Sequence, residues 1–246
     1  MSEARARFPW GLTLAVIPAL VLLLSLGAWQ VQRLHWKEGL IAEARRAATV
    51  PAGAPAAVLG SANPEFMKVS LTCPGLAGAP FIELQTIHDA DPGVRLISVC
   101  RHPGYEQALL VDRGFVSGSL SARPAEQADA TPVEIVAEVR LTPPPGAMAP
   151  PPEGRHFYAR DNVAMARVLG VQGPVSPWTF YALNASNPDW PALQPSAPPA
   201  AFSNNHLGYA MTWFGLAIVL VGFYIAMLRR RPRAPTPAGD TGKSST

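Results

Sequence analysis

Charged residues and cysteines are both scarce in this sequence, and each shortage excludes a class of protein. Asp, Glu, Lys and Arg make up 15% of the 246 residues, whereas about 25% is usual in soluble proteins. The deficit comes from two stretches, one near each end, that contain no charged residue. Neither of the two cysteines belongs to a CxxC pair, and no run of Cys and His has zinc-finger spacing. The composition therefore argues against an ordinary soluble domain and against a zinc finger.

Sequence signatures of catalysis and of nucleic-acid binding are also missing. No GxSxG, HExxH, Walker or GxGxxG motif occurs, so we expect that the protein is not an enzyme. The net charge of +3 and the pI of about 9.1 come from basic residues beside the two uncharged stretches, and the region between them mixes both signs. Such flanking clusters are typical of membrane topology signals, so we expect no nucleic-acid partner.

The two uncharged stretches are residues 8–31 (FPWGLTLAVIPALVLLLSLGAWQV) and 207–228 (LGYAMTWFGLAIVLVGFYIAML). About 20 apolar residues form a helix that spans the roughly 30 Å hydrocarbon layer. We therefore predict transmembrane helices over residues 10–31 and 206–228; Pro18 is compatible with the first. A cleaved signal peptide fits less well, because the apolar run is long and no small-x-small cleavage site precedes the charged segment.

Flanking cations predict the orientation of both helices. Arg5 and Arg7 precede the first stretch, and four arginines lie within residues 229–233. By the positive-inside rule both termini, residues 1–9 and 229–246, are cytoplasmic, although Arg33 and Lys37 oppose this weakly. Residues 32–205 then form a periplasmic domain. The short N-terminus MSEARAR lacks the character of a mitochondrial transit peptide, so we expect a bacterial cell inner membrane.

Between the crossings, short strand-like runs separated by turn-rich clusters predict an antiparallel β domain. The first helix should continue to about Pro51, and Asp161 is a candidate N-cap of a later short helix. Residues 51–64 and the proline-rich residues 143–152 are expected to be irregular connectors. The predicted fold class is two transmembrane α-helices flanking an extracytoplasmic α+β domain with a mainly antiparallel β core. The candidate strands are residues 66–73, 81–85, 94–101, 107–111, 133–141 and 178–183.

The two cysteines, Cys73 and Cys100, fall on different candidate strands of this domain. An oxidising compartment would favour a disulfide between them. Two buried free thiols are the alternative. A copper site formed with His102 is a third hypothesis, and a Cys-x-His pair alone is weak support for it.

Three blocks of sequence carry a resemblance to a known family. They are LGAWQVQRLHWKEGLI after the first stretch, LLVDRGFV in a central strand, and NNHLGYAMTWFGLA at the entry to the second stretch. In this order they resemble the surfeit locus protein 1 family, the cytochrome c oxidase assembly factors, which share the double-anchored topology. Asp112 stands where Asn is usual in that family, and Phe115 stands where Trp is common.

The resemblance implies an assembly role, in which the protein assists the insertion of haem a into subunit I of cytochrome c oxidase. Subunit I is then the expected partner, haem a synthase is a second one, and membrane lipid surrounds the helices. Two alternatives remain open. One is a scaffold or chaperone for subunit I that binds no haem, and the other is a doubly anchored periplasmic sensor or ligand-binding module.

The resemblance also implies that haem a is bound by a histidine at the start of the second crossing, here His206. Tyr209 and Trp213 follow on the same helical face, so an imidazole ligand for the haem iron would lie beside aromatic surface. Arg33 is a candidate partner for a haem propionate. The alternative is that all four are ordinary residues of the membrane interface. His35, on the same side of the membrane, is a further candidate ligand, with simple solvent exposure as its alternative.

Overall fold

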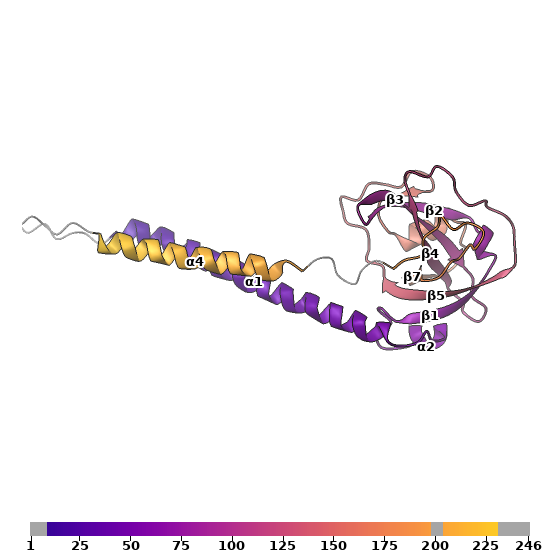
Figure 1. The fold of residues 1–246 in the computed structure, drawn as a ribbon, viewed down its shortest axis with the longest axis horizontal. Helices are drawn as coiled ribbons and strands as arrows, with labels where there is room; N and C mark the ends of the chain where they lie inside the picture. Colours follow the sequence, from indigo (N-terminus) through magenta and orange to yellow (C-terminus); the bar gives the residue numbers. More distant parts are fainter. Residues whose placement is uncertain (1–8, 198–203, 231–246) are drawn as a thin grey trace, which may run out of the picture. The chain divides into compact units, whose positions relative to one another are not determined.

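The computed structural model describes residues 9–197 and 204–230 (Figure 1). The chain divides into two compact units, one made of Met1–Gly39 and Ser203–Thr246 and the other of Leu40–Phe202. Arg5, Arg7 and residues 231–246, on which the predicted orientation depends, lie outside the described residues.

Two long apolar helices make up the first unit. α1 covers Trp10–Ala48 and α4 covers His206–Arg229, and both are long and apolar enough to cross a membrane, judged by length and composition alone. At 1.5 Å per residue the 39 residues of α1 extend for about 58 Å, roughly twice the hydrocarbon thickness. α1 therefore continues beyond the length of one crossing, as expected, and ends before Pro51.

α1 and α4 pack side by side in opposite directions (Figure 1). At one end of the pair, the hydroxyl groups of Thr13 and Tyr224 are hydrogen-bonded at 2.7 Å. Further along, Gly27 is buried under the ring of Phe214, and a Cβ atom at Gly27 would lie only 2.5 Å from that ring. A residue without a side chain therefore lets the helices approach closely, as is common between membrane helices.

The second unit contains a seven-stranded sheet in the order β1-β5-β7-β4-β3-β2-β6. All six predicted strand regions are confirmed, although β4 is longer than predicted, and the two-residue β6 was not predicted. The strands are β1 (Lys68–Pro74), β2 (Phe81–His88), β3 (Asp91–Cys100), β4 (Ala108–Ser117), β5 (Pro132–Leu141), β6 (His156–Phe157) and β7 (Val175–Ala182).

The sheet is mainly antiparallel, but two of its strand pairs are parallel. β4 pairs with β7 in parallel, and β2 pairs in parallel with the short β6. β7 is the last strand among the described residues and inserts between β5 and β4. Parallel neighbours need a long connection, and here it contains β5, β6 and α3 (Asn162–Val168). The domain is therefore a mixed sheet and not a purely antiparallel one.

A disulfide joins Cys73 at the end of β1 to Cys100 at the end of β3, with a Cα–Cα distance of 5.1 Å. Because β5, β7 and β4 separate these strands in the sheet, the sheet must curl for them to meet. The Thr72 backbone amide also donates to His102 Nδ1 at 3.1 Å, which links the same two regions. The disulfide leaves no thiolate for a copper site, and the described residues contain no group of three or more metal-ligating side chains.

One segment of the core was expected to be a connector. The largest buried cluster consists of side chains from β1, β3, β4, β5 and β7 together with Leu76 and Val58. Val58 belongs to α2 (Pro55–Leu59), a short helix with Pro55 at its start. The prediction that residues 51–64 are irregular is therefore wrong in part, because burial of Pro55 and Val58 stabilises a helical turn.

Two local features follow directly from the sequence. The side chain of Asp161 caps α3, because its Oδ1 atom accepts a hydrogen bond of 3.0 Å from the Ala164 amide. Residues 143–152 form neither helix nor strand, as expected.

The segment after β7 remains on the domain, since Gln194 and Phe115 exchange two backbone hydrogen bonds of 2.8 and 2.9 Å.

Candidate functional site

His206, the first residue of α4, contacts α1. Its Nδ1 atom lies 2.6 Å from Oε1 of Gln30, and the residue is half-buried. Gln30 lies near the end of the uncharged stretch of α1, where a polar amide in apolar surroundings needs a hydrogen-bond partner. The pair therefore ties the start of α4 to α1.

This hydrogen bond determines which ring nitrogen of His206 is free. An amide oxygen can only accept, so Nδ1 carries the hydrogen that is donated to Gln30. Nε2 of the neutral imidazole then keeps its lone pair, the form in which histidine binds a metal. Nε2 has no hydrogen-bond partner among the residues that the structure describes.

The two predicted aromatic residues of α4 differ in exposure. Tyr209 is 57% exposed, whereas Trp213 is half-buried. Ala210, one turn after His206, is buried, so the centre of this face is occupied by helix packing. Room for a ligand beside His206 therefore lies on the flank that carries Tyr209.

That flank is hollowed. A shallow open depression of about 470 Å³ is lined by Asn204, Asn205, Gly208, Tyr209 and Thr212. The Oδ1 atom of Asn204 is buried there and has no hydrogen-bond partner among the described residues.

The two candidates on α1 have different surroundings. The guanidinium of Arg33 is exposed and lies 4.0 Å from the ring centroid of Trp36. The side chain of His35 is 71% exposed and lies 3.3 Å from Glu38. At 3.6 residues per turn, His35 is about 140° around the helix from Gln30, so it does not share a site with His206.

A buried charge cluster in the β domain was missed by sequence reasoning. Oδ2 of Asp112 lies 2.7 Å from both Arg95 Nε and Arg160 Nη2. The ring of Tyr181 lies 5.4 and 4.9 Å from the two guanidinium carbons, and burial raises the pKa of its phenol. The sequence feature that could have indicated this cluster is the charged pair Asp112–Arg113 inside the otherwise apolar strand ALLVDRGFVS. The cluster has the character of a structural network, because the two cations share one carboxylate.

Arg113, the next residue, is completely buried on β4. The register shift between β3 and β4 leaves it without a partner residue, and Gly114 follows with φ 135°, which marks a bend of the strand at this Arg-Gly pair. Its guanidinium donates to Ser186 Oγ at 3.1 Å and to the Ala77 carbonyl at 2.9 Å. Burial lowers its pKa to about 10. Arg113 is therefore a structural residue.

Known proteins match most of the chain. The model of the SURF1 family matches residues 17–218, a range that contains every predicted site residue. The chain is 28% identical to "Surfeit locus protein 1" of Homo sapiens over 214 residues, 78% of this chain and 69% of the human protein. It is 27% identical to the Mus musculus protein of the same name over 239 residues, 89% and 76% of the two chains. It is 28% identical to "SURF1-like protein" of Drosophila melanogaster over 231 residues, 85% and 74%.

Proposed function

The chain belongs to the SURF1 family, and on that premise we propose that it is a non-catalytic assembly factor for cytochrome c oxidase that assists the insertion of haem a into subunit I. Oxidase assembly is the general role of the family. The observation that carries the haem part of the proposal is the hydrogen bond between His206 and Gln30. It leaves Nε2 of the imidazole without a partner among the described residues, at the start of a helix that is apolar enough to cross a membrane.

The residues around His206 fit a haem. Nε2 has a free lone pair, the neighbouring flank of α4 is open beside Tyr209, and the guanidinium of Arg33 is exposed. A bound haem supplies an iron that accepts an imidazole ligand and propionates that accept hydrogen bonds from guanidinium groups.

Each of the candidate site residues then has a defined task. His206 would hold the iron through Nε2, and Gln30 orients the imidazole by accepting the Nδ1 hydrogen. Tyr209 and Trp213 provide aromatic contact surface along the helix. Arg33 would neutralise a haem propionate.

The proposed location is the inner membrane of a bacterial cell, with both termini in the cytoplasm and the β domain in the periplasm. The disulfide between Cys73 and Cys100 supports an oxidising compartment for this domain. Subunit I is the proposed partner, with haem a synthase as a second partner and membrane lipid around α1 and α4. Protease added to spheroplasts should digest the domain and spare both termini.

The test of the haem proposal is an absorption spectrum of the detergent-purified protein from cells that make haem a. The wild type should carry haem a, His206→Ala should lose it, and the matched control His35→Ala should keep it, since His35 points elsewhere. Unchanged haem content in His206→Ala would exclude His206 as the ligand.

Two outcomes would favour the alternatives. A haem-free wild type that still co-purifies with subunit I would indicate a scaffold. A deletion strain with normal oxidase activity and normal haem a content would indicate a sensor or ligand-binding module.

A further inference from the structure

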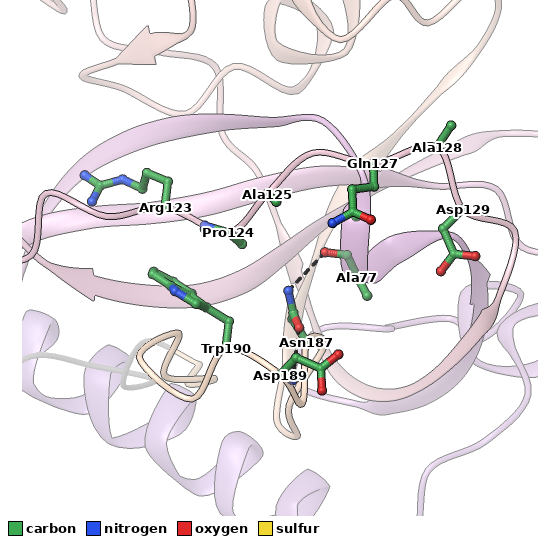
Figure 2. A pocket seen from close by; sticks show the side chains of 11 residues that line it. Ala77, Arg123, Pro124, Ala125, Gln127, Ala128, Asp129, Asn187, Asp189 and Trp190 are labelled. Carbon is green, nitrogen blue, oxygen red and sulfur yellow. Dashed lines mark hydrogen bonds between the residues drawn. The ribbon is translucent and has the colours of Figure 1, made fainter.

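The pocket drawn in Figure 2 is not part of the proposed haem site. It has a volume of about 460 Å³ and lies in the β domain, between η1 (Leu76–Gly78), the segment after β4 and the loop after β7. Trp190 and Asp129 lie at opposite ends of it, so these side chains do not converge on one ligand (Figure 2). The residues that position His206 are found instead between α1 and α4.

Two polar contacts join α1 to α4 near opposite ends of the pair. The hydroxyl groups of Thr13 and Tyr224 are 2.7 Å apart, and Nδ1 of His206 lies 2.6 Å from Oε1 of Gln30. At 1.5 Å per residue, α1 rises by about 26 Å from Thr13 to Gln30, and α4 rises by about 27 Å from His206 to Tyr224. Because these lengths agree, one antiparallel register satisfies both contacts. A slide by one helical turn, about 5.4 Å, would break both.

Gly27 of α1 lies under the ring of Phe214 of α4, between these two contacts. Among the 39 residues of α1, which the structure describes in full, Gly27 is the one that is buried. A Cβ atom there would lie 2.5, 2.7 and 2.9 Å from three ring atoms of Phe214, so the ring occupies the space that a side chain would need. Open space surrounds the same position at the other glycines of the two helices, which are Gly11, Gly39, Gly208, Gly215 and Gly222.

The rotation of α4 is fixed by the same packing. Ala210 and Ala217 are only 2% and 3% exposed, whereas the residues on either side of Ala210 are more than half exposed. The two alanines are seven residues apart, which is two turns, so they mark the face of α4 that packs on α1. His206 and Phe214 are each one turn from Ala210 and belong to this face. Close packing of α4 therefore turns His206 toward α1.

We propose that Gly27 and Phe214 are positioning residues for His206. Single hydrogen bonds between membrane helices contribute modestly, so the fit of the Phe214 ring over Gly27 selects the register. In that register Gln30 holds Nδ1 of His206, and Nε2 is free for a ligand. The consequence for haem rests on the proposed function, whereas the register does not.

A crosslinking experiment measures the register without haem. Gln30→Cys and His206→Cys are introduced together into the full-length protein, which is kept in its membrane. A short bis-methanethiosulfonate reagent should join the two helices, and mass spectrometry of the unreduced protein detects the product. Cys73 and Cys100 do not react, because they form a disulfide.

Substitutions in this background test the role of the packing. Gly27→Leu should lose the crosslink, and Phe214→Ala added to Gly27→Leu should restore it by making room for the leucine. Gly215→Leu is the matched control, since a side chain there meets open space, and it should keep the crosslink. Undiminished crosslinking in Gly27→Leu, an equal loss in Gly215→Leu, or no restoration by Phe214→Ala would overturn the proposal.

Absorption spectra of detergent-purified proteins, with His206 and Gln30 intact, test the consequence for haem. Gly27→Leu should bind haem a at least about tenfold more weakly than the wild type, as when the hydrogen-bond partner of a ligating histidine is lost. Phe214→Ala in the same chain should restore most of the affinity. Unchanged haem affinity in Gly27→Leu would overturn the positioning role. A wild type without haem a would refute the proposed function instead, and the crosslinking would still decide the register.

Discussion

Arg95 and Asp112 form an ion pair inside the β domain, with Nε of Arg95 2.7 Å from Oδ2 of Asp112. Arg160 contacts the same oxygen, and the Arg95 guanidinium also donates to the backbone carbonyl of Ser196. Asp112 and Arg95 together thereby connect β3, β4 and the segment that follows β7. Desolvation offsets much of the attraction in such a cluster, but the removal of one partner is strongly destabilising.

We expect Asp112→Asn to lower the free energy of unfolding by about 3 kcal/mol, because Arg95 and Arg160 would both lose their carboxylate. Urea denaturation followed by circular dichroism measures this change. The double variant Asp112→Asn, Arg160→Gln should recover part of the lost unfolding free energy, since it removes one of the two cations that no longer have a carboxylate partner. A double variant that is no more stable than the single one would contradict this account.

Gln30→Leu should weaken haem binding about tenfold, as is typical when the hydrogen-bond partner of a ligating histidine is removed. The measurement is the haem titration of the detergent-purified variant. Gln32→Leu is the matched control, because Gln32 is exposed on the same helix. If Gln30→Leu binds haem as tightly as the wild type, the hydrogen bond to His206 does not position the imidazole.

Replacing both Cys73 and Cys100 by Ala should lower the free energy of unfolding by roughly 3 kcal/mol, as expected for a crosslink that closes a loop of this length. Urea denaturation of the oxidised wild type and of the variant gives the difference. Reductant should bring the wild type close to the variant and leave the variant unchanged. A wild type that is insensitive to reductant would contradict the role of the crosslink.

Glu65 should make the stability of the domain depend on pH. Burial raises the pKa of its carboxyl above the ordinary value of 4.5, against the opposing hydrogen bond from the Leu141 amide. The folded state therefore holds this proton more tightly than the unfolded state, and rising pH favours unfolding.

The unfolding free energy of the wild type should accordingly fall, relative to that of Glu65→Gln, as the pH is raised from about 4 to about 7. Urea denaturation of both proteins across this range measures the difference. A difference that stays constant, or that grows in favour of the wild type, would be inconsistent with the raised pKa.

The helices and strands of this protein were largely predictable because local sequence determines them. The lack of charge in two long runs predicts α1 and α4. Asp161 has the side chain of a helix N-cap, and α3 begins at the following residue.

Other features depend on contacts between residues far apart in the sequence, which periodicity and composition do not encode. Gln30 was part of the family pattern, but only the packing of α1 on α4 shows that it contacts His206. The pairing of β4 with β7 and the choice of disulfide over free thiols depend in the same way on the order of strands in the sheet. Burial of Val58, which turns part of a proline-containing connector into α2, is a further example.

The crosslink between β1 and β3 has a consequence for biogenesis. Its two thiols meet in the native sheet only when β5, β7 and β4 occupy the places between them, and β7 ends at Ala182. The crosslink in its native place is thus complete only after β7 has joined β5 and β4 in the sheet. Thiol alkylation during synthesis would therefore trap unfinished chains, and the oxidised form would mark those that have matured.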